Sequence, residues 1–135
     1  MKKLLALIPV VALLATASCR KDDNNPSNPS GKGGNATIQA TPQHHGKNID
    51  SCTIYIKYNT LDAPADGKYD DSAVCVQISN KPVATFTQLK KGPYYLYGRG
   101  WDTSISQTVV GGIPYTVPDT TATTYSVNVP VTEGD

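Results

Sequence analysis

The chain has 135 residues, with 12 Lys and Arg against 11 Asp and Glu and a formal net charge of +1. Charged residues make up only 17%, Phe and Met occur once each, and Tyr occurs 8 times. This composition excludes a helical bundle or a coiled coil. A near-neutral chain without a basic cluster also gives no electrostatic basis for binding nucleic acid.

The first 18 residues have the features of a leader. Lys2 and Lys3 form a short positive region, an apolar run extends from Leu4 to Ala15, and small residues lead to Cys19. The run is too short for a stable membrane span, and its pattern predicts a secretory signal peptide over 1–18. Its removal leaves about 117 residues, which suits one domain.

The residues that follow the leader indicate where the protein is located. Cys19 directly after small residues resembles the lipobox of bacterial lipoproteins, in which the cysteine is acylated and becomes the new N-terminus. Lys21, Asp22 and Asp23 are similar to the surface-export signal of Bacteroidota lipoproteins. These resemblances imply a lipid anchor in the outer membrane with the protein exposed at the cell surface. A position facing the periplasm, with these charges as a plain solvated tether, is the alternative.

The segment 19–35 is expected to be a lipidated N-terminus and a flexible tether. Asn24 to Asn35 contains Asn, Pro, Ser, Gly and one Lys but no large apolar residue, so it lacks the side chains that pack into a core. We therefore expect the folded domain to cover 36–135, beginning near Ala36.

The rest of the chain consists of short runs in which apolar and polar residues alternate, separated by turn residues. No window shows an apolar period of 3.6 residues, so no helix is expected. The pattern predicts an all-β protein, an antiparallel β-sandwich of about seven strands. The runs are 36–41, 51–59, 73–79, 83–89, 94–98, 105–110, 113–117 and 123–131.

The last run alternates most clearly. Val127, Val129 and Val131 share one parity, which is expected to face inward, and Pro130 has the other. Because proline cannot donate to a ladder, the end of this strand should lie at the edge of a sheet.

One stretch carries a resemblance to a known fold family. Phe86, Leu89, Gly92, Tyr94 and Leu96 match the F-x-x-L-x-x-G-x-Y-x-L signature of prealbumin-like and carboxypeptidase-regulatory-like domains. The resemblance implies that Leu89 closes one strand, Gly92 makes the turn and Tyr94 begins the next strand facing inward. It implies the fold and leaves the function open.

Two cysteines remain in the domain, in a compartment that permits a disulfide. Cys52 shares the inward parity of Ile54, whereas Cys75 lies opposite Val74 and Val76 and is therefore expected to point outward. Both a disulfide between Cys52 and Cys75 and two separate thiols are consistent with the sequence.

Three groups of residues are candidates for binding. An aromatic patch with polar neighbours could stack on a sugar, as Tyr and Trp offer rigid amphipathic surface. The adjacent His44 and His45 and a loop of four aspartates could hold a metal, but both are more typical of surface turns, and we assign no metal site and no cofactor. The patch is Tyr95, Tyr97, Arg99, Trp101 and Asp102, and the loop contains Asp62, Asp66, Asp70 and Asp71.

No recognisable catalytic arrangement is present in the sequence. The only Glu is Glu133, in the C-terminal tail, and no glycine-rich phosphate loop or nucleophile elbow occurs. We therefore expect a non-enzymatic, lipid-anchored protein of the cell envelope with a structural or interaction role. The alternative is a carbohydrate-binding accessory lipoprotein that uses the patch around Trp101, and the expected partners are the outer membrane and a surface glycan or protein, not nucleic acid.

Overall fold

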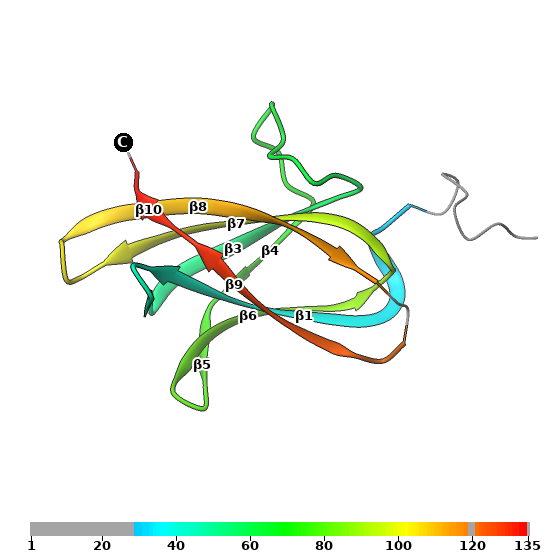
Figure 1. Ribbon diagram of the computed structural model, residues 1–135, viewed down its shortest axis with the longest axis horizontal. Coiled ribbons are helices and arrows are strands. Elements are labelled where there is room, and N and C mark those ends of the chain that lie inside the picture. The colour runs from blue at the N-terminus through cyan, green and yellow to red at the C-terminus, as the bar shows by residue number, and fades with distance from the viewer. Residues whose placement is uncertain (1–28, 119–120, 135) are drawn as a thin grey trace, which may run out of the picture.

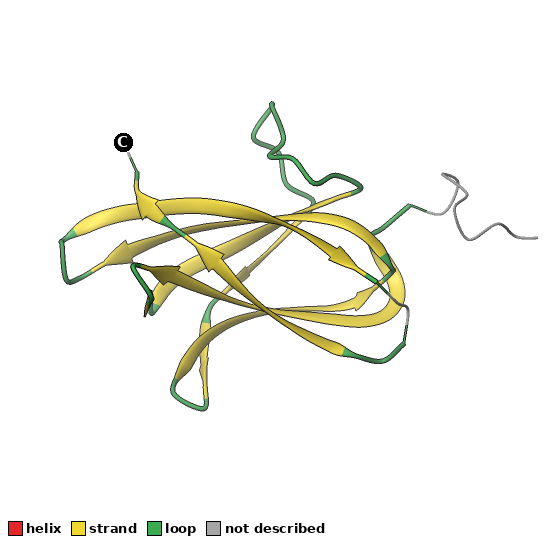
Figure 2. Cartoon of the chain, in the orientation of Figure 1, coloured by secondary structure: helices red, strands yellow, loops and turns green. Residues whose placement is uncertain are grey.

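The computed structural model describes residues 29–118 and 121–134 and contains only strands, turns and loops over these residues (Figures 1 and 2). None of these residues belongs to a helix long and apolar enough to cross a membrane. The predicted leader 1–18, Cys19 and the export residues 21–23 lie outside the described residues. The described strands are β1 (Lys32–His44), β2 (Lys47–Asn48), β3 (Ser51–Tyr58), β4 (Asp71–Val74), β5 (Val76–Ile78), β6 (Lys81–Leu89), β7 (Gly92–Asp102), β8 (Gln107–Val117), β9 (Thr124–Pro130) and β10 (Thr132–Glu133).

The strands form two packed sheets, which confirms the prediction of an all-β sandwich. The first sheet has the order β2-β1-β6-β5, with β9 also paired to β1, and the second has the order β10-β8-β7-β3-β4. All pairs are antiparallel except β1 with β9. This pair is parallel because β8 ends beside the start of β7, at the end of the sandwich where β1 begins. The chain then crosses to the first sheet and runs alongside β1 in the same direction (Figure 1).

Alternating side chains of the two sheets fill the space between them. Ile54 and Ile56 of β3 and Val127 and Val129 of β9 are buried, as their parity predicts. Among the described strands β9 pairs with β1 alone, so Pro130 lies at a sheet edge as expected.

The turn between β6 and β7 has the geometry expected of it. Leu89 and Tyr94 on either side are fully buried. Gly92 has a φ of 126°, and a Cβ there would lie 2.9 Å from the Cβ of Ser30, so both backbone conformation and space require glycine.

The folded part begins earlier than the sequence indicates. β1 starts at Lys32, four residues before Ala36, and Ser30 is already buried. The Ser30 hydroxyl donates to the carbonyl of Pro93 at 2.7 Å and accepts from the backbone N–H of Asn59 at 2.7 Å. Hydrogen bonds to the second sheet thus hold the polar segment around Ser30 in place. A search for apolar alternation in the sequence does not detect such a segment.

The runs 105–110 and 113–117 form one strand, β8, which starts at Gln107. Gly111 and Gly112 do not make a turn here but allow close approach. A Cβ on Gly111 would lie 2.3 Å from the Pro130 carbonyl oxygen, and one on Gly112 would lie 2.5 Å from the Tyr95 hydroxyl.

The predicted outward orientation of Cys75 is wrong. Cys75 is buried in the core, whereas Val74 and Val76 on either side are 68% and 57% exposed. β4 pairs with β3 in the second sheet and ends at Val74. β5 pairs with β6 in the first sheet and begins at Val76, so Cys75 is the single residue between them. Ala73 also packs against the core, and Ile78 is exposed, so the alternation continues through the change of sheet with the larger apolar residues on the outer side.

Candidate binding surface and histidine cluster

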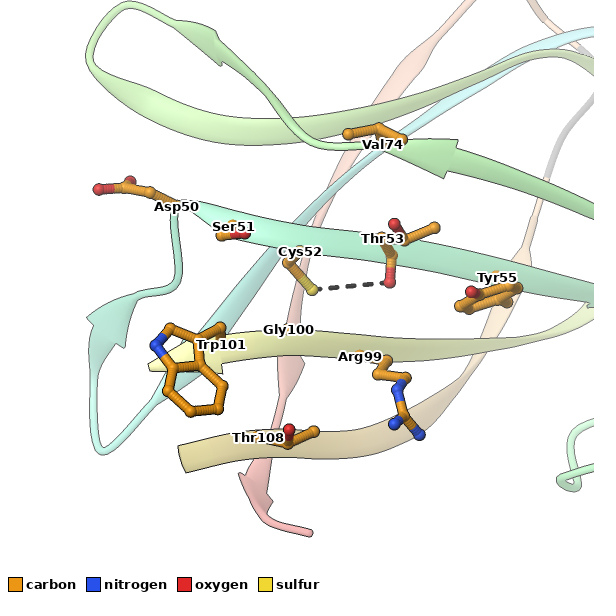
Figure 3. A pocket seen from close by; sticks show the side chains of 10 residues that line it. All are labelled: Asp50, Ser51, Cys52, Thr53, Tyr55, Val74, Arg99, Gly100, Trp101 and Thr108. Atoms are coloured by element: carbon orange, nitrogen blue, oxygen red, sulfur yellow. Dashed lines mark hydrogen bonds between the residues drawn. The ribbon is translucent and has the colours of Figure 1, made fainter. Parts of the chain in front are cut away.

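The outer face of the second sheet carries an open hollow of about 650 Å³. Trp101 and Arg99 project into it from β7, and Thr108 of β8 lies beside Trp101 (Figure 3). Thr53 of β3 lines the opposite side, whereas the Asp50 carboxylate at its rim points away from Trp101 and accepts a hydrogen bond from the Gln77 amide at 3.0 Å. Trp101 is 47% exposed, so an aromatic face, a guanidinium and hydroxyls surround one concave surface.

The structure brings together only part of the predicted aromatic patch. Arg99 and Trp101 share the hollow, but Tyr97 is occupied by other rings: it stacks on Tyr69 at 5.6 Å between centroids and lies 6.2 Å from Tyr55. Tyr95 covers Gly112 of β8. The patch is therefore two features on one sheet face, a tyrosine cluster and the hollow beside it.

Asp102 is not part of this surface. It follows Trp101 on β7 and points to the opposite side of the sheet, where it is buried. Its predicted role as a polar contact beside Trp101 is wrong because neighbouring residues of a strand face opposite sides. Tyr55 of the tyrosine cluster has the outward parity of Thr53, which the sequence shows, whereas no sequence pattern brings Tyr69 of the β3–β4 loop onto the sheet.

The aspartate loop between β3 and β4 uses its carboxylates to hold its own backbone. The Asp70 carboxylate accepts the backbone N–H of Tyr58 at 2.7 Å and lies 3.3 Å from the Lys57 ammonium. The Asp66 carboxylate accepts the N–H of Lys68 at 3.0 Å. These contacts are those of a solvated turn that connects two strands.

His44 and Asp102 form a buried pair at the end of the sandwich. The Nδ1 of His44 lies 2.7 Å from Oδ2 of Asp102, and both side chains are buried. The other oxygen of Asp102 accepts hydrogen bonds from the backbone N–H and the hydroxyl of Ser104, at 2.8 and 2.6 Å. The bonds from Ser104 and then from His44 lower the pKa of Asp102 to about 2, and the bond to Asp102 raises the pKa of His44.

The expectation that both histidines are surface turn residues is wrong for His44. β1 continues through His44, and the turn is made by His45 and Gly46, which have φ values of 48° and 77°. His44 has the even parity of Ile38 and Ala40, and this parity points it inward. The same rule applies to Asp102, which shares the parity of Tyr94 and Leu96 in β7.

The two cysteines are free thiols and lie side by side in the core. The backbone N–H of Cys75 donates to the carbonyl of Cys52 at 2.9 Å. The hydrogen bond with Cys75 and burial raise the pKa of the Cys52 thiol, whereas the hydrogen bond with Cys52 lowers the pKa of Cys75.

Comparison with protein-family models, with curated proteins and with solved structures finds no match to this chain. The residues themselves therefore carry the functional argument.

Proposed function

We propose that this chain is a lipid-anchored, non-enzymatic binding protein of the bacterial cell envelope. Its domain is proposed to be of the prealbumin-like type, and the outer face of the second sheet is its interaction surface. The observation that carries this proposal is the hollow around Trp101, where a half-exposed indole lies beside a guanidinium on a rigid sheet.

The chemistry of the hollow favours binding over catalysis. Cys52 also lines it, but burial and the hydrogen bond with Cys75 raise the pKa of that thiol and disfavour the thiolate. Arg99 supplies charge and donors, the Thr53 and Thr108 hydroxyls supply donors and acceptors, and Trp101 supplies a flat apolar face.

A saccharide is the second, narrower candidate for the ligand. An exposed indole stacks on the apolar face of a sugar ring, and hydroxyl and carboxylate groups around it hydrogen-bond the sugar hydroxyls. Trp101 with Arg99 and Thr108 offers an indole face and hydrogen-bonding groups in one concave site.

A comparison of one variant at Trp101 with one at Leu61 tests the hollow as a glycan-binding surface. We expect Trp101→Ala to lower binding to a partner glycan, found on a glycan array, by about tenfold, in line with ~1.4 kcal/mol of stacking and burial. Leu61→Ala is the matched control, because Leu61 is 46% exposed but lies in the β3–β4 loop and does not line the hollow. Equal glycan binding by both variants would refute the saccharide ligand.

The wider interaction role has its own test. The protein is displayed on cells with a photo-crosslinking residue at position 108, which lines the hollow, or at position 66, which does not. The cells are then irradiated. We expect adducts with an envelope protein or glycan from position 108 only. Adducts of the same kind and yield from both positions would remove the hollow as the interaction surface.

The proposed surface location depends on the export residues. Replacing 21–23 with alanine should protect the protein from protease added to intact cells while leaving it in the membrane fraction. Unchanged cleavage would remove the support that this tripeptide gives to surface exposure.

A further inference from the structure

Three ligand atoms converge at the end of the sandwich where β1 and β7 finish. A ring nitrogen of His44, a ring nitrogen of His45 and a carboxylate oxygen of Glu133 lie within 4.8 Å of one another. They come from the end of β1, the following turn, and β10, so the group joins a strand of the first sheet to one of the second. Among the described residues this is the one such group of three.

His44 is held in the orientation that metal-binding histidines have. Its Nδ1 is 2.7 Å from the Asp102 carboxylate, and in the neutral ring this carboxylate favours the tautomer with the proton on Nδ1 and the lone pair on Nε2. Asp102 is fixed in turn by two hydrogen bonds from Ser104. A carboxylate behind the ring that sets its tautomer is the usual support of a histidine ligand.

The Nε2 atom of His44 lacks a partner suited to it. It is buried, the His44 side chain is 3% exposed, and it has no hydrogen bond. Its nearest charged neighbour is Oε2 of Glu133 at 3.4 Å. A lone pair facing a carboxylate oxygen is unfavourable, and buried polar atoms without partners are rare, so a cation between the two atoms would satisfy both.

The separation of His44 Nε2 and Glu133 Oε2 suits zinc. Zn–N and Zn–O bonds of about 2.0–2.2 Å at a tetrahedral angle place neighbouring ligand atoms roughly 3.3–3.5 Å apart. The separation of His44 Nε2 and Glu133 Oε2, 3.4 Å, falls in that range. With Glu133 and Asp102 both ionised, a divalent ion would also neutralise the charge of the group.

We propose that His44, His45 and Glu133 bind one Zn²⁺ ion, with Asp102 orienting His44 and a fourth position open to solvent. A hollow of about 390 Å³ lined by both histidines, Ile113 and Thr132 adjoins the site and leaves room for water there. The bound ion links β10 to the β1–β2 turn and so cross-links the two sheets at one end. This site is separate from the hollow around Trp101 and does not depend on the proposed function.

Calorimetric titration of the purified, metal-free protein with Zn²⁺ tests the proposal, and Co²⁺ absorption reports the coordination. We expect saturable binding of one Zn²⁺ per chain, a zinc-dependent rise in melting temperature, and the intense visible bands of tetrahedral Co²⁺. Glu133→Gln and His45→Asn should each weaken binding at least tenfold. Both positions are exposed, and Asn tolerates the positive φ of His45, so these variants should fold.

Asp66→Asn is the matched control, because it removes an exposed carboxylate in the aspartate loop and should leave zinc affinity unchanged. No saturable binding to the unaltered chain would overturn the proposal, as would affinity lost equally in Asp66→Asn. So would a His44 ring that nitrogen NMR shows to carry protons on both nitrogens at neutral pH with zinc present, since a histidinium between Asp102 and Glu133 leaves no lone pair for a metal.

Discussion

The same substitution, Tyr to Phe, made separately at the neighbouring Tyr94 and Tyr95 tests which face of β7 points into the core. Tyr94 is fully buried, and its hydroxyl accepts the backbone N–H of Gly31 at 2.8 Å and donates to the carbonyl of Lys90 at 2.7 Å. Tyr95 is half-buried on the outer face, over Gly112. Tyr94→Phe removes a hydroxyl from a buried network, whereas Tyr95→Phe removes one from the surface.

The magnitude follows from the two groups that Tyr94→Phe leaves unpaired. A buried N–H or C=O without a partner costs about 1–3 kcal/mol, a large share of the ~5–15 kcal/mol that stabilises a whole domain. For Tyr95→Phe we expect a change within about 0.5 kcal/mol. Urea unfolding of both variants and the unaltered protein at neutral pH measures these differences.

The same pair predicts a dependence on alkaline pH. Burial raises the pKa of Tyr94, so the folded state holds the phenol proton more tightly than the unfolded state does. Its contribution to stability is fully present below the unfolded value of about 10 and is lost as the pH rises through the folded value. The unaltered protein should therefore lose stability more steeply above pH ~10 than Tyr94→Phe.

The reasoning would be refuted if Tyr95→Phe cost as much as Tyr94→Phe at neutral pH. The inward parity of β7, and with it the packing of the two sheets, would then be wrong. Identical alkaline profiles for Tyr94→Phe and the unaltered protein would show that the buried phenol does not carry the pH dependence.

Two further substitutions and one labelling experiment have expected outcomes. Leu89→Ala should cost about 2–5 kcal/mol in urea unfolding, because Leu89 is fully buried and its removal leaves a cavity; a cost below ~1 kcal/mol would place it outside the core. Cys19→Ser should move the protein from the membrane fraction to the soluble fraction, and retention in the membrane would contradict a lipid anchor at that residue. Cys52 and Cys75 should both resist a thiol reagent in the native protein and both react after unfolding; a pair that stays unreactive after unfolding without reductant would be a disulfide.

Alternation along single strands could be predicted well from the sequence. Ile54, Ile56, Val127 and Val129 face the core as their spacing indicates, because a strand with one buried face imposes a period of two. The glycine of the β6–β7 turn could also be predicted, since its φ of 126° is one that other residues rarely adopt.

The errors arise where position in the fold overrides the local pattern. In 73–79 the sequence favours Val74, Val76 and Ile78 as the inner side, but these residues are exposed and the smaller Cys75 is buried. The chain changes sheet at Cys75, where β4 pairs with β3 and β5 forms a hairpin with β6, and no local pattern marks this change. His44 and Asp102 are different: their parity already points inward, but polar residues beside turn signals suggested the surface. Their burial is tolerated because each supplies the partner that the other needs.

The direction of the strands determines which end of the domain faces away from a proposed anchor. β1 begins two residues after the buried Ser30 and ends at His44, and β7 begins beside the same end and finishes at Asp102 (Figure 1). At about 3.3 Å per residue, the 13 residues of β1 span roughly 40 Å. The hollow at Trp101 and the histidine cluster therefore both lie at the end opposite to the chain's entry. A lipid on Cys19, as proposed, would hold the domain from its entry end and leave this end free for partners.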